Sequence, residues 1–139
     1  MAVVYKYRGA TACQVTGIDK QRFNEAVASG RYPCAPTVRK GGTRTFTEDD
    51  IIALFVYARL IEQEIPPRVA GDIACAVRSK LEEDPSVEEI RIPRYSEIGT
   101  HPPSKAGDEF SVHVHMSFDI AGIRAAIAPT LKRTREGNI

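Results

Sequence analysis

Hydrophobic residues recur at intervals of three and four in three long stretches of the chain, which is the spacing of an α-helix. The first stretch follows Thr47, the second follows Pro66-Pro67, and the third follows Asp119. Their apolar positions are Ile51, Leu54, Phe55, Ala58, Ile61 and Ile65, then Val69, Ile73, Val77 and Leu81, then Ile120, Ile123, Ile127 and Leu131. Thr47 with Asp50 forms a capping-box pattern, Pro67 suits a first helical turn, and Asp119 is a good N-cap. The sequence therefore predicts three amphipathic helices with defined starts.

Alternation with a period of two predicts strands near the C-terminus. Residues 110–118 alternate apolar and polar side chains without a break, and residues 87–93 predict a second strand with Pro93 at an edge. Residues 96–109 lie between them and contain several Gly and Pro residues, which predicts a loop. Val3, Tyr5 and Tyr7 also alternate with their neighbours and predict a short opening strand.

Two short helices are expected before Thr47. The segment Ala10 to Val15 forms the first, Thr16-Gly17 makes the turn, and Asp19 to Ala28 forms the second. Asp19 can cap the second helix, and Gly30 can end it in the left-handed conformation. The pair has the arrangement of a helix-turn-helix.

A hairpin is expected after this pair. Residues 37–39 and 44–46 can form its two strands, because Gly41-Gly42 between them supplies the positive φ of a tight turn. We interpret this hairpin as a wing beside the second helix.

Charge is distributed unevenly, although the net charge of the 139 residues is only +1. Residues 1–47 carry eight Lys or Arg against two acids, whereas residues 48–139 carry eleven against sixteen. A basic front and an acidic back would turn the N-terminal face toward a polyanion such as double-stranded DNA. The candidate base-reading residues are Lys20, Gln21, Arg22 and Asn24, and the candidate DNA-backbone contacts are Arg39, Lys40, Thr43 and Arg44.

Several of these residues carry a resemblance to a known family. Thr16-Gly17-Ile18, the helix after it, the pattern Arg39-x-x-Gly42-x-Arg44-x-Phe46 and then Thr47-Glu48-Asp49-Asp50-Ile51 resemble the DNA-binding half of the MerR family. The similarity covers about residues 5 to 83. Excisionases and other small phage-type DNA-bending proteins share this winged domain, so the resemblance indicates a domain more than a biological role.

The predicted fold class is α+β, with a MerR-like winged helix-turn-helix domain over residues 1–84 and a small strand–strand–helix segment over residues 85–139. This second segment departs from metal- and drug-sensing MerR proteins, in which a long coiled-coil helix would follow. We expect residues 87–131 to pair with a second copy of the chain, and residues 1–84 to remain folded as a monomer without them.

No cofactor or metal is expected. The three cysteines, Cys13, Cys34 and Cys75, have no CxxC spacing and are predicted to be reduced thiols in or near the core. Cysteine ligands of MerR metal sensors lie beyond the winged domain, and this chain has none after Cys75. His113 and His115 would share one face of a strand, a spacing that some metal sites use, but we expect them to face solvent without a third ligand.

Other signals narrow the functional class. No phosphate-binding Gly loop and no Ser or Cys nucleophile motif with a partner His is evident, so an enzyme is not expected. No apolar run of about 18 residues predicts a membrane span, and the first residues lack the shape of a signal peptide. We expect a cytoplasmic protein.

Three functions fit these patterns. The first is a homodimeric, sequence-specific transcription regulator. The second is an architectural factor that bends DNA for a recombinase. The third is a winged domain that serves as a protein-interaction module, such as an adaptor or antitoxin. The extra C-terminal segment favours the first.

Overall fold

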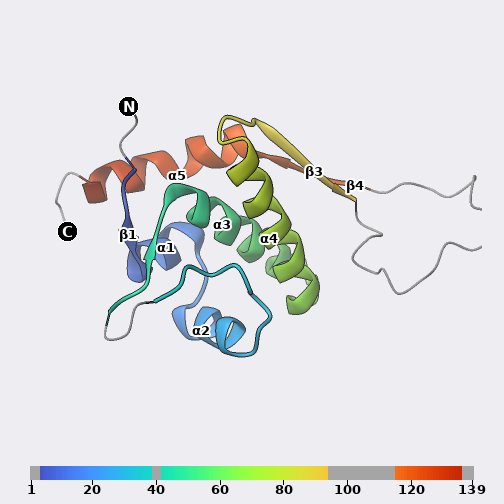
Figure 1. Ribbon diagram of the computed structural model, residues 1–139, viewed down its shortest axis with the longest axis horizontal. Helices are drawn as coiled ribbons and strands as arrows, with labels where there is room; N and C mark the ends of the chain where they lie inside the picture. The colour runs from blue at the N-terminus through green and yellow to red at the C-terminus, as the bar shows by residue number, and fades with distance from the viewer. Residues whose placement is uncertain (1–3, 39–41, 94–114, 136–139) are drawn as a thin grey trace, which may run out of the picture.

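The computed structural model describes residues 4–38, 42–93 and 115–135, and over these residues the fold is α+β. The described residues form five helices and two small two-stranded antiparallel sheets (Figure 1). In chain order the elements are β1 (Tyr7–Arg8), α1 (Gly9–Thr16), α2 (Lys20–Ala28), β2 (Thr45–Phe46), α3 (Glu48–Glu62), α4 (Pro67–Glu83), β3 (Glu89–Pro93), β4 (His115–Asp119) and α5 (Ile120–Arg135).

The predicted helix-turn-helix pair is confirmed as two helices. The Asp19 carboxylate accepts the amide of Arg22 at 3.0 Å and so caps α2. Gly17 (φ 80°) ends α1, and Gly30 (φ 79°) follows α2, both in the left-handed region. Three residues therefore separate the two helices, and Gly17 permits the sharp change of direction.

Helix α3 is the centre of the core, and it ends at Glu62, so Ile65 of the predicted apolar pattern lies beyond it. Thr47 and Asp50 form the capping box that starts it, with the Asp50 carboxylate accepting the Thr47 amide at 2.9 Å. Eight of its residues are buried, and α4, which begins at Pro67, packs along it. Arg78 of α4 donates to the other oxygen of Asp50 at 2.8 Å, which ties α4 to the start of α3.

The C-terminal strand and helix predictions are also confirmed over the described residues. Strands β3 and β4 pair with Ile90 opposite Phe118 and Ile92 opposite Met116. Helix α5 starts at the predicted cap, where the Asp119 carboxylate accepts the Gly122 amide at 2.9 Å. The predicted loop over residues 96–109 and the first part of the predicted strand, residues 110–114, lie outside the described residues.

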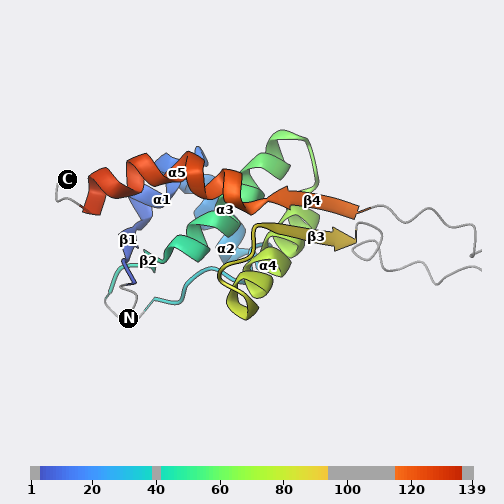
Figure 2. The same ribbon diagram turned by 90° about the horizontal axis from the view of Figure 1, so that it is seen from above.

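Helix α5 lies across α1 and α3 (Figure 2). Its buried residues Ile120, Ile127 and Leu131 belong to the same hydrophobic cluster as the cores of α3 and α4. The two segments that the sequence analysis separates at residue 84 thus share this cluster.

The predicted wing pairing is wrong for the described residues. Strand β2 pairs with β1, with Tyr7 opposite Phe46 and Arg8 opposite Thr45, while Thr37 and Val38 are outside any strand. This pairing buries both aromatic rings, with Tyr7 only 3% and Phe46 only 1% exposed. A local hairpin would not have brought Tyr7 onto Phe46, so burial of these rings favours the long-range pairing. The predicted turn residues up to Gly41, with Arg39 and Lys40, lie outside the described residues.

The prediction of three reduced cysteines is also wrong. Cys34 and Cys75 form a disulfide, with their Cα atoms 5.5 Å apart, and Cys13 is free and buried. The partners lie 41 residues apart in the chain, and only the packing of the segment after α2 against α4 brings them together.

No helix in the described part of the chain is long and apolar enough to cross a membrane.

Candidate nucleic-acid interface

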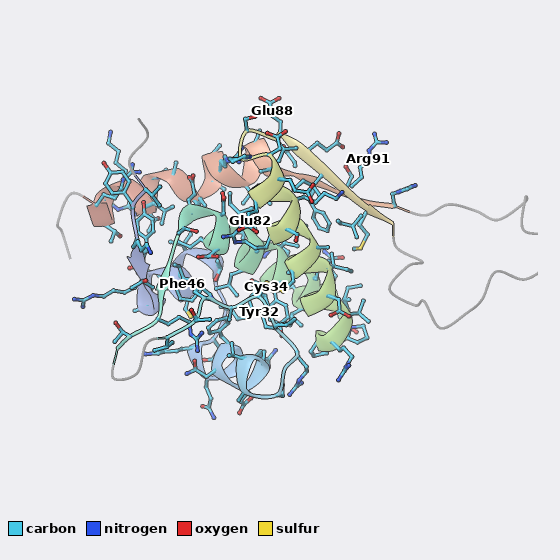
Figure 3. The ribbon with its side chains drawn as sticks, viewed as in Figure 1. Tyr32, Cys34, Phe46, Glu82, Glu88 and Arg91 are labelled. Atoms are coloured by element: carbon cyan, nitrogen blue, oxygen red, sulfur yellow. A yellow bond between two sulfur atoms is a disulfide. The ribbon has the colours of Figure 1, made fainter. Side chains whose placement is uncertain are left out.

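Helix α2 presents one polar face to solvent. Its apolar residues Phe23 and Ala26 are buried, and the Phe23 ring packs 5.7 Å from Tyr32 and 5.8 Å from Phe46. Figure 3 shows Tyr32 and Phe46 on the side of α2 that faces the rest of the fold. The candidate base-reading residues Lys20, Gln21, Arg22 and Asn24 are all exposed on the other faces.

The turn ahead of α2 is held by α3. The Thr16 hydroxyl donates to the carbonyl of Ala12 at 2.8 Å, and the Arg59 guanidinium donates to the carbonyl of Thr16 at 2.6 Å. Arg59 also lies over the Phe55 ring and pairs with Glu62 at 3.2 Å. Because the end of α1 is attached in this way to α3, the most buried helix, the direction of α2 relative to α3 is fixed.

A hollow of about 480 Å³ opens beside the start of α2. We refer to it as the basic hollow. Its lining residues come from β1, α1, α2 and the segment before β2, and they are Arg8, Gly9, Ala10, Cys13, Lys20, Phe23, Asn24, Thr43, Arg44 and Phe46. Phe23, Phe46 and Cys13 are buried, whereas Arg8, Lys20, Asn24 and Thr43 are exposed. The basic hollow thus has apolar residues at its floor and polar and cationic residues around its rim.

The basic hollow has no acidic residue among those that line it. Burial raises the pKa of the Cys13 thiol, which keeps this floor residue neutral near pH 7. Other concave regions of the described surface mix charges: Lys6 and Arg78 share one with Asp50 and Glu82, for example. A rim of three cations with no nearby carboxylate in its lining suits a phosphate backbone.

The structure brings together four of the eight predicted contact residues. Lys20 and Asn24 of α2 meet Thr43 and Arg44 around the basic hollow. We keep the name wing for residues 42–46, although over the described residues they do not form the predicted hairpin. Gln21 lies elsewhere on α2, with its side-chain amide 3.5 Å from the Glu25 carboxylate. Arg22 lines two other depressions, next to residues of α3 and the start of α4. Arg39 and Lys40 are outside the described residues.

Arg44 is held by the segment that precedes the wing. Its guanidinium donates to the carbonyl of Pro36, and the side chain is half-buried. A guanidinium has five N–H donors, so this bond fixes the group while leaving others for a ligand. The position of Arg44 thus depends on where residues 34–38 lie.

Arg8 is the residue of this interface that sequence reasoning missed. It stands between the opening strand and the first helix, where nothing in its neighbours marks it as a contact. Arg8 pairs with Thr45 across β1 and β2, and Thr45 directly follows Arg44, so this pairing carries Arg8 to the rim of the basic hollow. The excess of basic residues in the first 47 was a signal for the region but not for this residue.

Among the described residues no group of three or more His, Cys, Asp and Glu side chains could hold a metal ion. His115 is exposed on β4, and His113 lies outside the described part of the chain.

Comparison with protein-family models gave no match to this chain, and a search of curated proteins found none with significant similarity.

Proposed function

We propose that this protein is a sequence-specific DNA-binding regulator that uses a MerR-like winged helix-turn-helix. Helix α2 enters the major groove, and the residues around Thr43 and Arg44 contact the adjacent DNA backbone. The observation that carries the proposal is the basic hollow, which joins the start of α2 to the wing and has no carboxylate in its lining.

The geometry of α2 supports this role. The helix is seated by Phe23 and Ala26, capped by Asp19, and exposes four polar or basic side chains over its first five residues. A rigid short helix with such a face is what base readout in a major groove requires. In this proposal the protein works in the cytoplasm, the compartment in which a bacterial-type regulator meets DNA.

The proposal includes a homodimer formed through residues 87–131. One small winged domain covers little DNA, and tight specific sites usually take two copies. Within the described residues β3 and β4 pair only with each other, so each strand leaves one edge open to a strand from a second chain. Sedimentation of the full-length protein at tens of micromolar tests this part, and a monomer at that concentration would contradict it.

Selection of bound fragments from a random DNA pool tests the function itself. An enriched inverted repeat supports a dimeric regulator, with half-sites about one helical turn apart or a multiple of it. Enrichment of flexible steps without a base motif would instead indicate an architectural, DNA-bending factor. No enrichment would reject both DNA-binding functions and favour a protein-interaction module.

A further inference from the structure

The disulfide lies at the point where the chain leaves α2 and heads for the wing. Cys34 belongs to the segment after α2, and Cys75 lies on α4. Figure 3 places Cys34 close to Tyr32, between α2 and α4. Two residues beyond Cys34, the carbonyl of Pro36 accepts the Arg44 guanidinium. A continuous series of bonds therefore runs from α4 through the disulfide and Pro36 to a cation on the rim of the basic hollow.

The chain just before Cys34 is held independently of the disulfide. Tyr32 is only 2% exposed, and its ring packs 5.0 Å from Tyr57 of α3. The amides of Arg31 and Tyr32 donate to the carbonyl of Ala26 at 2.9 and 3.2 Å. Gly71 of α4 allows the carbonyl of Arg31 to approach so closely that a Cβ atom would lie 1.7 Å from it. These contacts fix the end of α2 whether or not the two sulfurs are joined.

The chain after Cys34 has fewer attachments. Thr37 and Val38 are exposed and lie outside any strand, and Cys34 to Pro36 are half-buried. Besides the disulfide, three hydrogen bonds hold this stretch within the described residues: the Cys34 amide donates to the Cys75 sulfur at 3.2 Å, the Ala35 amide donates to the Tyr32 carbonyl at 3.4 Å, and the Arg44 guanidinium donates to the Pro36 carbonyl. Apart from the packing of Cys34 and Ala35 against the hydrophobic cluster, the position of this stretch thus depends on the sulfur–sulfur bond. We refer to residues 34–38 as the tethered segment.

The disulfide can be reached from solvent. Both cysteines are half-buried and line an open hollow of about 570 Å³. The charged side chains around this hollow are Lys6, Arg78, Asp50 and Glu82, so their formal charges balance and do not repel an incoming thiolate overall. Disulfides in a reducing cytoplasm are rare and are usually transient, catalytic or redox-sensing.

We propose that the Cys34–Cys75 disulfide is a reversible switch that fixes the tethered segment, and with it Arg44, in the oxidised protein and releases them in the reduced protein. The inference rests on the proposed DNA-binding function and specifies how that function is regulated. The oxidised form holds the wing cation in place before DNA arrives, so less conformational freedom is lost on binding. Helix α2 keeps its position in both forms, because Tyr32 and Gly71 hold its end.

The exchange partner is a small thiol of the glutathione class. A small-molecule thiolate attacks the Cys34 sulfur and forms a mixed disulfide with it. Cys75 leaves as a thiolate, accepts a hydrogen bond from the Cys34 amide, and then takes up a proton. A second small thiol resolves the mixed disulfide, so that two protein thiols and one small-molecule disulfide result. Two electrons pass from the small thiols to the protein in the overall step.

DNA binding by oxidised and reduced protein, measured by fluorescence anisotropy over a salt titration, tests the consequence for function. We expect reduction to weaken binding roughly five- to tenfold for specific and unrelated sequences alike, with an unchanged salt slope, because Arg44 keeps its charge and still pairs with a phosphate in the complex. The order of preference among sequences is expected to stay the same. Equal affinity in both forms would overturn the proposal.

Two variants sharpen this comparison. Cys34→Ser with Cys75→Ser is expected to bind like the reduced protein and to ignore reductant. Cys13→Ala keeps the pair; because Cys13 lines the basic hollow its absolute affinity can differ from that of the wild type, but its oxidised and reduced forms are expected to differ by the same factor as those of the wild type. If the response to reductant disappeared in Cys13→Ala, the effect would come from Cys13 and not from the Cys34–Cys75 pair, and the proposal would be overturned.

Hydrogen exchange and thiol trapping test the switch without DNA. In a glutathione series the pair is expected to open and close reversibly, with faster amide exchange in residues 34–38 of the reduced form and unchanged exchange in α2. A disulfide that stays closed in a large excess of reduced glutathione, or amide exchange that does not change on opening, would refute the switch. If exchange changes but neither form binds DNA, the switch stands and the DNA-binding function fails.

Discussion

At the scale of single residues, the interface separates two kinds of cation. Arg44 is half-buried and fixed by Pro36 at the rim of the basic hollow, whereas Arg22 is exposed on α2 away from that hollow. A fixed cation beside the DNA backbone contributes to binding of any sequence, while a side chain on the recognition helix can reach base edges. Removal of the two arginines is therefore expected to affect DNA binding in different ways.

Arg22→Ala should cost about 1–3 kcal/mol of binding free energy and relax sequence preference. Arg44→Ala should weaken binding to all sequences alike and lower the salt slope by about one. Salt titrations on a selected and an unrelated DNA duplex separate the two effects. Lys80→Ala is the control, because it also removes one positive charge, from an exposed position of α4 that lies outside both the basic hollow and the proposed dimer segment. If both interface variants bound like this control, the assignment of α2 and the wing would be wrong.

The acidic first turn of α3 gives a prediction about pH. Burial raises the pKa of Asp49 above its usual value, and this outweighs the opposite effects of Arg78 and Arg124. The folded protein therefore binds this proton more tightly than the unfolded chain, so the group's contribution to stability falls as pH rises through the raised pKa. Asp49→Asn should lose less stability than the wild type as pH rises above the ordinary pKa of an aspartate, by an amount below about 1 kcal/mol because the group is only half-buried.

Urea unfolding at a series of pH values measures this difference. Glu48→Gln, on an exposed position of the same turn, provides the control for loss of a charge. An Asp49→Asn profile that paralleled the wild-type profile would show that burial does not control this carboxyl group.

At the scale of elements, the close approach of α4 to the end of α2 is the contact on which the interface depends. Gly71 meets the carbonyl of Arg31, Cys75 bonds to Cys34 one turn later, and Tyr32 fills the space between them and α3. Helix α4 thus acts as the support for α2, and α3 supports the turn before it through Arg59.

Gly71→Ala tests this support. Intrinsic helix propensity alone would favour alanine by about 1 kcal/mol. The new methyl group, however, would lie 1.7 Å from the Arg31 carbonyl oxygen, which is backbone and cannot move without displacing α2. We expect a net destabilisation of about 1–3 kcal/mol by overpacking.

Chemical denaturation compares this variant with Asp72→Ala, an exposed neighbour on the same helix that should stay within about 0.5 kcal/mol of wild type. A Gly71→Ala protein that gained stability would mean that α4 and the end of α2 can separate at no cost.

At the scale of the whole molecule, the C-terminal segment completes the core. The sequence suggested that residues 1–84 fold alone. Ile120, Ile127 and Leu131 of α5 are at most 2% exposed and belong to the cluster that α3 and α4 form. Removing even one such side chain typically costs about 2–5 kcal/mol, and a small domain has only about 5–15 kcal/mol in total.

Truncation after Asp84 is therefore expected to abolish cooperative thermal unfolding rather than leave a folded monomer. Circular dichroism melting of this fragment makes the measurement. Truncation after Arg135, which removes four residues, is the control and should melt like the full chain. A fragment of residues 1–84 with a sharp transition would restore the two-domain interpretation.

The sequence by itself determined the helices and where the three long ones begin. Thr47, Asp50, Pro67 and Asp119 act on backbone groups within a few residues, and apolar periodicity depends only on the geometry of one helix. These signals are local, so they could be recognised without knowledge of the tertiary contacts. The polar face of α2, with Lys20 and Asn24, was identified for the same reason.

Only the tertiary structure decided the contacts between distant parts of the chain. The pairing of β2 with β1, the position of Arg8 at the basic hollow, the Cys34–Cys75 disulfide and the single shared core each join segments far apart in sequence. Each depends on which apolar surfaces find one another when the whole chain collapses, and the free energy of burial is not directional. No local pattern could single out Tyr7 rather than Val38 as the partner of Phe46.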